Sequence, residues 1–579
     1  MARNMQLGIQ IQGISIGYVL HLDIRQQMNN HHHFQVACAS LEQENTLLSS
    51  FDDYVGKEIT ISMSSDNYGQ IGDFFTGLVT HVGLSREHGG QTRLIISGSS
   101  PSILLDNGQW TQSFTKKSLS AIVNKITGDY GQLSIKVSPA MTDSIDYITQ
   151  YKESHFQFIN RLSRIYGEWF YYDGKELFFS KRQKSASIEI KLGRELSYFD
   201  LSLRLAPTLA SFQAYHNEQA NLHMANATSA GPSDLDQYGN KVLKTSERFF
   251  DQEVLVPVKH LATTKGTVSN LLKRHRSAQM NDTVILSGAS SNPLLRLGST
   301  IKVLGINEEG KDIDYGEFNI IQINHSADGN GNYSNSFEAI PASLQSPPLP
   351  GFQKDPMCEN QVAVVMENDD PAKLGRVRLQ FKWHEGTDEM SPWVSTMNTS
   401  AGATHGFYFV PEEGDEVMVG FEFNNPDRPY VLGTVYNGKA KPTISDPKNN
   451  KKQILTKSGN QILFVDEKGK EEIQIVNGGN TIVMSLSDSG VINITTKGDM
   501  TLDAKNINIK ASSAVNISGA KITANATGEL TAEGGSKATV KGGEVLVEST
   551  ASSTVKSSGT VEVNGGTATN VIGGVIKLN

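Results

Sequence analysis

Three adjacent histidines, His31, His32 and His33, are the residues of this sequence that most resemble a metal site. Protein zinc sites need several His, Cys or carboxylate side chains that converge on one ion. Adjacent imidazoles point apart, and no thiol pair or carboxylate at ligand spacing accompanies these three. We therefore expect a loop triplet and no cofactor. Because no histidine follows His405, we also expect no histidine-held ion at the C-terminal end.

Serine, histidine and aspartate are plentiful, yet no nucleophile motif stands where it could work. No Gly-x-Ser-x-Gly elbow occurs in a fitting strand-to-helix context, and there is no GxxxxGK[ST] phosphate loop. Without a candidate nucleophile and base, we expect a protein that is not an enzyme.

The segment Gly375–Arg378 is basic and could be interpreted as a strand that binds nucleic acid. Such surfaces combine basic residues with exposed aromatics, which are not interleaved here. Acidic residues follow closely at Glu412, Glu413 and Glu416, and the net charge of the chain is −9. We expect these residues to support packing and chain contacts, with no nucleic acid as partner.

Length and composition place the chain among ordinary globular proteins. Its 579 residues correspond to roughly four domains, and 38% of them are apolar. Cys38 and Cys358 lie too far apart in sequence for a disulfide framework and are expected to be reduced thiols. The N-terminus shows no charged segment followed by an apolar one. The sequence therefore predicts synthesis in the cytosol without a signal peptide, and export, if any, by another route.

The distribution of residue types divides the chain. All aromatic residues occur at or before Phe464, the last arginine is Arg428 and the last proline is Pro447. Proline-rich or charged stretches without apolar periodicity follow at 346–351 and 439–452, which is typical of linkers. We expect an α+β region at 1–350 with two or more subdomains, a barrel at 358–437, a linker at 438–454 and a repeat at 455–579.

The first region shows local signals for both strands and helices. Strands with period-two patterning are expected at 7–16, 58–63, 93–96, 300–304 and 318–323. Ser118 is expected to cap one helix, and Ser154 with Gln157 forms a capping box for a second helix that ends at Gly167. A third helix is expected at 267–280, and the aromatic run 168–172 should begin a strand.

The middle region has five short apolar segments bounded by turn residues, at 361–366, 375–383, 406–410, 416–423 and 430–435. Five strands in so short a stretch favour a small barrel of the oligonucleotide/oligosaccharide-binding (OB) type.

The last region is a repeat. From Met500 onward, pairs of small apolar residues recur every seven or eight positions, with Gly, Ser or Asn between them. One such unit buries too little apolar surface to offset the entropy of ordering it, so it must stack against other copies. Three chains wound together would place these residues on a shared axis with no room for aromatics. The expected axis residues are Met500, Leu502, Ile507, Ile509, Val515, Ile517, Ile522, Leu530, Val540, Val545, Val547, Val555, Val561 and Val563. A single-chain β-solenoid and a disordered tail remain alternatives.

Several motifs in this order resemble the VgrG spike proteins of type VI secretion systems, which are related to phage tail hub-and-spike proteins. Glu153–Leu162 with Gly167–Tyr172 is similar to the hub helix and strand of that family, and Tyr333–Pro341 is similar to the end of the hub. The residues that resemble its barrel motif are Gly375, Arg376, Val377, Phe381, Trp383, Trp393, Pro411, Gly414, Glu416, Pro426, Asp427, Arg428, Pro429, Tyr436 and Asn437.

The resemblance implies a mainly β fold with an α+β hub, an OB barrel and a C-terminal triple-stranded β-helix in a homotrimer. It implies a hexameric Hcp-like tube and baseplate proteins as partners, effector proteins as cargo, and a target membrane that is punctured mechanically. It also implies a PAAR-type cap at the tip, for which Val575, Ile576 and Leu578 are the expected landing residues. The hub-spike of a phage or phage-derived contractile tail and an adhesin or glycan-binding fibre remain alternatives.

Overall fold

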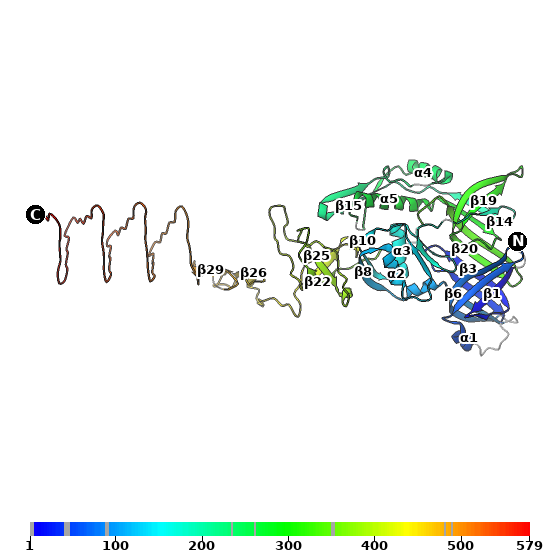
Figure 1. Ribbon diagram of the computed structural model, residues 1–579, viewed down its shortest axis with the longest axis horizontal. Coiled ribbons are helices and arrows are strands. Elements are labelled where there is room, and N and C mark those ends of the chain that lie inside the picture. Colours follow the sequence, from blue (N-terminus) through cyan, green and yellow to red (C-terminus); the bar gives the residue numbers. More distant parts are fainter. Residues whose placement is uncertain are drawn as a thin grey trace. The chain divides into compact units, whose positions relative to one another are not determined.

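The computed structural model describes residues 5–39, 47–86, 92–183, 185–232, 235–259, 262–348, 354–479, 482–487 and 490–578. The chain forms two units, Met1–Thr443 and Ile444–Asn579, and we describe each by itself (Figure 1). The expected domain boundary at residue 350 lies outside the described residues. Strands are the main regular element of the first unit, and no helix among the described residues is long and apolar enough to cross a membrane.

Thirteen described strands of the first unit form one large sheet. Its backbone pairings are antiparallel except for β13 with β19. At its centre β3 pairs with β20, so segments about 300 residues apart in sequence lie side by side. The strands are β1 Met5–Ile11, β2 Ile14–Ser15, β3 Val19–Gln27, β4 His33–Ala39, β5 Glu58–Ser65, β6 Gly69–Arg86, β7 Thr92–Ser99, β13 Ile188–Lys191, β14 Leu196–Leu203, β18 Val284–Ser290, β19 Thr300–Ile306, β20 Asp312–Asp328 and β21 Tyr333–Pro341.

Three smaller sheets accompany the large one. β8 (Trp110–Ser118) pairs with β10 (Ser144–Glu153). A second sheet contains β9, β11 and β12, and a third contains β15, β16 and β17. Their bounds are β9 Ile135–Ser138, β11 Trp169–Tyr172, β12 Leu177–Ser180, β15 Ala210–His216, β16 Asn221–Ala225 and β17 Val254–Pro257.

Local capping signals set the helices. α2 (Leu119–Thr127) begins after Ser118, whose side chain accepts from the backbone of Ala121, as predicted. α3 (His155–Tyr166) has the predicted capping box and ends at Gly167 with φ of +71°. α5 (Lys265–Met280) confirms the third helix. α1 (Leu47–Tyr54) and α4 (Gln237–Phe249) were not predicted.

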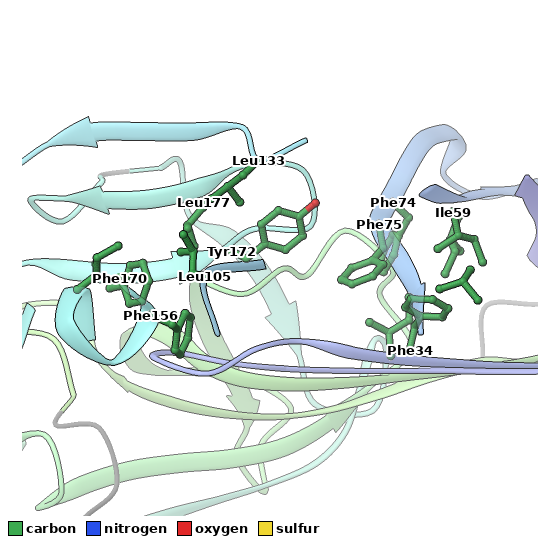
Figure 2. Packing of buried hydrophobic residues seen from close by; sticks show 14 of the residues in the cluster. Phe34, Ile59, Phe74, Phe75, Leu105, Leu133, Phe156, Phe170, Tyr172 and Leu177 are labelled. Carbon is green, nitrogen blue, oxygen red and sulfur yellow. The ribbon is translucent and has the colours of Figure 1, made fainter. Parts of the chain in front are cut away.

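The main core of the first unit lies between the large sheet and the α2–α3 layer. Aromatic side chains from distant segments meet there, including Phe34, Phe75, Phe170 and Tyr172 (Figure 2). Each is almost fully buried, and burial of such a side chain contributes about 1.5–3 kcal/mol relative to its exposure. This core fixes α3 and β10, which carry the polar site described below.

The barrel region forms a four-stranded sheet of β22 (Gln361–Glu367), β23 (Arg378–Phe381), β24 (Glu416–Phe421) and β25 (Pro429–Thr434). The predicted strand at 375–383 is therefore shorter. The predicted strand at 406–410 is wrong: Gly406 has a φ of +149° and makes one isolated bridge, and the side chains that follow it are exposed. An apolar run becomes a stable strand when other residues pack on its side chains, and no described residues bury these side chains.

The second unit opens with an antiparallel meander of β26 (Lys451–Leu455), β27 (Gln461–Val465), β28 (Glu472–Val476), β29 (Ile482–Ser487) and β30 (Ile492–Thr496). β26 begins inside the segment 438–454 that the sequence analysis assigned to a linker, so the end of that segment is strand. After Thr496 no described residue belongs to a strand, and Figure 1 draws the stretch as repeated turns.

Candidate functional site

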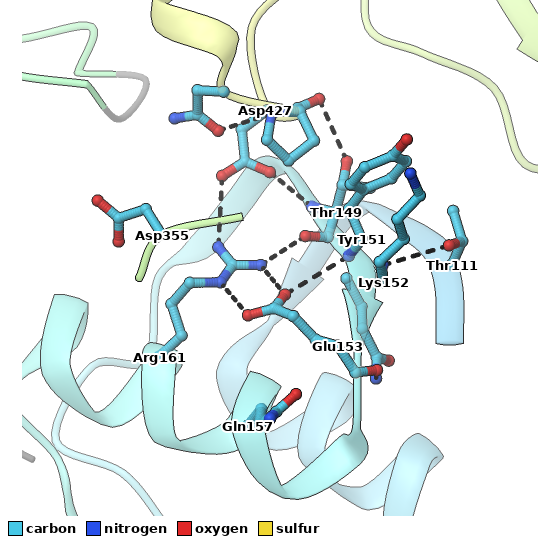
Figure 3. Close-up of polar contacts among 12 residues, drawn as sticks. Thr111, Thr149, Tyr151, Lys152, Glu153, Gln157, Arg161, Asp355 and Asp427 are labelled. Atoms are coloured by element: carbon cyan, nitrogen blue, oxygen red, sulfur yellow. Dashed lines mark hydrogen bonds and ion pairs between the residues drawn. The ribbon is translucent and has the colours of Figure 1, made fainter. Parts of the chain in front are cut away.

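The barrel is joined to the N-terminal region through a buried arginine. Arg161, on α3, is 1% exposed, and its Nε and Nη2 donate to the two carboxylate oxygens of Glu153 at 2.8 Å each (Figure 3). Its Nη1 lies 3.7 Å from Oδ2 of Asp427, in the barrel. The planar guanidinium therefore connects the last residue of β10 with a loop about 270 residues later in the sequence.

Asp427 is held from two sides. Its Oδ1 accepts from the backbone N–H of Thr149 at 2.7 Å, and its own N–H donates to Asn425 at 3.0 Å. Burial raises the pKa of Asp427 to about 6, although Arg161 and the Thr149 N–H act in the opposite direction. A buried carboxylate in this position depends on the arginine charge, so the junction is sensitive to loss of either partner.

Further contacts fix the barrel on two smaller sheets of the N-terminal region. Ser113 of β8 bonds to His384 at 2.6 Å, and Thr115 donates to the carbonyl of Met390 at 2.9 Å. On another side, Asn425 donates to the carbonyl of Lys259 at 2.7 Å. These bonds span two separate sheets, so the barrel and the N-terminal region form one polar interface.

The residues of the barrel motif divide into packing, turn and ion-pair positions. Arg376 binds Asp370 within the barrel and reaches Glu218 of the N-terminal region. Val377 and Phe381 are buried, and Trp383 stacks on Phe381. The remaining positions are Gly375 and Gly414 at positive φ, half-buried Trp393 and Pro429, buried Pro411 and Pro426, Arg428 paired with Glu422, Glu416 bonded to Asn437, and exposed Tyr436.

The histidine triplet lies at the start of β4, and its three rings have different surroundings. His31 bonds to Ser102 and to Asp106, both at 2.9 Å, whereas His33 bonds to Ser99. His32 is buried, and its Nδ1 accepts a hydrogen bond from the side-chain Nε2 of Gln26. The side-chain Oε1 of Gln26 in turn accepts from Nε2 of His325. Among the described residues, no group of three or more His, Cys, Asp or Glu is arranged to hold a metal ion.

Burial lowers the pKa of His32 to about 3 and holds that of His325 well below its usual range. The unfolded chain takes up a proton on His32 near pH 6.5, whereas the folded chain does so only near pH 3. The contribution of neutral His32 to the free energy of unfolding is therefore complete above pH 6.5 and is lost as the pH falls toward 3. We expect the stability difference between the wild type and His32→Gln to shrink by up to about 1.4 kcal/mol per pH unit between pH 6 and pH 4. Urea unfolding across this range measures it, and a difference independent of pH contradicts it.

The sheet of the second unit has one continuous apolar face. Ile454, Ile462, Ile475, Met484 and Ile494 stand directly opposite one another across all five strands. A second apolar row lies beside it on the same face: Phe464, Ile473, Leu486 and Ile492. This face was not predicted from the sequence, although alternate apolar residues between glycine turns signal it.

No layer of the chain covers that face among the described residues. Ile475 is 46% exposed, Ile473 is 39% exposed and Ile494 is 54% exposed. An exposed apolar patch that is continuous over several strands is typical of a protein–protein contact.

The repeat after Thr496 is exposed in the single chain throughout. Ile509 is 68% exposed and Val540 is 80% exposed, as representative axis residues. All described residues from 497 to 578 are exposed, including the other expected axis residues and the cap residues Val575, Ile576 and Leu578. In the single chain no described residue from 497 to 578 belongs to a strand, because a unit of this size finds no strand partner within its own chain. The exposure also argues against a single-chain solenoid, whose interior its own coils would cover.

Two family models match the chain. The phage tail baseplate hub (GPD) model matches residues 25–331, more than half of the chain. The type VI secretion system/phage-baseplate injector OB domain model matches residues 361–436, and the described barrel strands lie within these bounds.

Individual proteins of the VgrG type are also similar to this chain in sequence. The chain is 24% identical over 409 residues to the type VI secretion system spike protein VgrG5 of Pseudomonas aeruginosa, across 62% of this chain and 50% of that protein. It is 31% identical over 212 residues to the actin cross-linking toxin VgrG1 of Vibrio cholerae, across 33% of this chain and 19% of that protein. The chain therefore spans half or less of the length of these relatives.

A solved chain of the Francisella PdpA–VgrG complex in its half-lidded form has the same fold. The TM-score is 0.56 at 10% sequence identity, and the match covers 86% of this chain and 88% of the other. The hub model covers β4 to β20 and the α2–α3 layer, and because it matches more than half of the chain, the chain belongs to the phage tail baseplate hub family and is similar to spike proteins of the VgrG type.

Proposed function

We propose that three copies of this chain form the spike at the tip of a contractile injection apparatus of the type VI secretion kind. The observation that carries the proposal is the uncovered apolar face of β26–β30, followed by a repeat whose apolar side chains are all exposed. Three chains that share an axis would cover both. The repeat then forms a triple-stranded β-helix, with Ile509, Val515 and the other axis residues inside.

The role of such a rod is mechanical and not enzymatic. Strands bonded between chains distribute an axial load over many hydrogen bonds, and small side chains keep the cross-section narrow. The N-terminal hub (1–350) and barrel (358–437) would hold the rod on a hexameric tube and the baseplate. Val575, Ile576 and Leu578, exposed at the end of the described chain, would receive a PAAR-type cap. Effector proteins would travel with the spike out of the cytosol as the target membrane is punctured.

The mass of the full chain in solution tests the trimer. Light scattering should report about 189 kDa, which is three chains of 63.1 kDa. A folded single chain would overturn the proposal.

Delivery tests the role of the rod. A chain truncated after Gly498 keeps the hub and barrel, so Trp fluorescence should still report their folded state, while secretion and target-cell killing are abolished. Normal killing by this truncated chain would refute the mechanical role. Because the hub model also describes phage tails, the tube protein that co-purifies with the full chain distinguishes a secretion apparatus from a phage-derived tail.

A further inference from the structure

The outer face of β3, β4 and β20 carries a polar cavity of about 400 Å³ that the proposed function does not use. Asn324 of β20, Arg25 of β3 and His33 of β4 stand directly opposite one another in the sheet. Because residues directly opposite share a face, these three side chains form one row across the cavity. Gln322 and His31 also line it.

The lining carries an unbalanced positive charge. Among the described residues no carboxylate lines this cavity, and the exposed Arg25 has no hydrogen bond or ion pair to its guanidinium. The neighbouring carboxylates are already engaged: Asp106 binds His31, and Asp23 binds His21 at 2.9 Å. Arg25 is therefore an exposed cation on the sheet with no counterion among the described residues.

A buried polar network beneath the sheet holds Arg25 in place. Gln26, the next residue of β3, points to the other face and bonds to both His32 and His325, and His325 bonds to Tyr333 at 2.7 Å. The network is made of neutral groups and spans β3, β20 and β21. It fixes the backbone on which Arg25 stands, so only side chains need to be ordered when a ligand binds.

We propose that this cavity binds a side-chain carboxylate of an extended acidic segment in a partner polypeptide. A guanidinium binds a carboxylate with two parallel hydrogen bonds, and the amides of Gln322 and Asn324 can both donate to and accept from a peptide backbone. A carboxylate fits better than a phosphate, because only one group of the lining carries a permanent charge. This inference goes beyond the spike proposal and does not depend on the tail.

The experiment uses the full chain and a fluorescein-labelled tetraglutamate peptide, with the tetraglutamine peptide as reference. Anisotropy at about 50 mM salt, where screening is weak, measures binding. We expect Arg25→Gln to weaken tetraglutamate binding at least about tenfold, the loss of one charge-assisted pair. The matched control is Arg93→Gln, an exposed arginine of β7 that shares this face of the sheet but does not line the cavity.

Each of the following outcomes either supports or overturns the proposed carboxylate site. Tenfold weakening by Arg25→Gln with less than about twofold by Arg93→Gln supports the site. Equal weakening by both variants, or no tetraglutamate binding at about 1 mM, overturns it. Displacement by inorganic phosphate at lower concentration than by free tetraglutamate overturns the carboxylate assignment. Light scattering on the same samples reports the number of chains, so failure of the spike proposal is recognised separately.

Discussion

Replacing Arg161 by methionine should lower the free energy of unfolding of the first unit by about 3–5 kcal/mol. The substitution keeps an apolar side chain of similar length but leaves Glu153 and Asp427 buried without their cation. A carboxylate stranded in this way must either stay charged at high cost or take up a proton. The barrel should then separate from the N-terminal region at lower denaturant concentration than in the wild type.

Tryptophan fluorescence during urea unfolding measures this, because all four tryptophans lie in the first unit. The matched control is Arg164→Met, three residues further along α3. Arg164 pairs with Asp355, and both side chains are partly exposed, at 26% and 35%. Loss of such a pair costs about 1 kcal/mol or less. Equal losses for the two variants would show that the Arg161 network does not hold the junction.

Ile475→Asp should prevent assembly of the proposed trimer while the first unit stays folded. Ile475 lies in the central strand of the β26–β30 sheet, in the middle of its apolar row. In a trimer the change places three carboxylates in an apolar contact, each at a cost of several kcal/mol. In a lone chain the same residue is 46% exposed, and the change would be nearly neutral. Light scattering should therefore show the mass fall from three chains to one.

Asn493→Asp is the control for this experiment. Asn493 precedes Ile494 on β30, so its side chain lies on the opposite face of the same sheet and is exposed. It introduces the same carboxylate without entering the apolar row and should leave the trimer intact. A trimer that survives Ile475→Asp unchanged would place the chain contact elsewhere.

Local structure could be predicted from the sequence wherever a few adjacent residues decide it. Ser154, Gln157 and Gly167 fix both ends of α3 through their own hydrogen bonds and backbone angles. α4 was missed although Asp236 caps it in the same way, because its short apolar stripe contains only one fully buried large side chain, Val242. Signals of this kind act within one turn and need no distant partner.

Pairing between distant segments could not be predicted. Nothing in the residues of β3 specifies β20 as its partner, because many strands share the same alternation. At 406–410 a strand was predicted where none forms. The aromatic run has strand propensity, but the backbone angle of Gly406 and the exposure of the following side chains prevent a strand.

The buried ion network around Arg161 was not predicted as a site, although its members lie in motifs singled out from the sequence. Glu153, Arg161 and Asp427 all stood within the motifs that resemble the spike family. Their convergence on one buried ion network depends on how the barrel packs on β10, which no spacing in the sequence encodes. The apolar face of the second unit was missed because its residues were divided between a linker and a repeat.

The uncovered β26–β30 face and repeat have a consequence for the newly made protein. The first unit has a core built within one chain, whereas in the proposed trimer the second unit would reach its final form only when three chains meet. Encounter of three chains depends steeply on their local abundance. Overproduction that leaves single chains unassembled would therefore expose apolar segments that aggregate and are accessible to proteases.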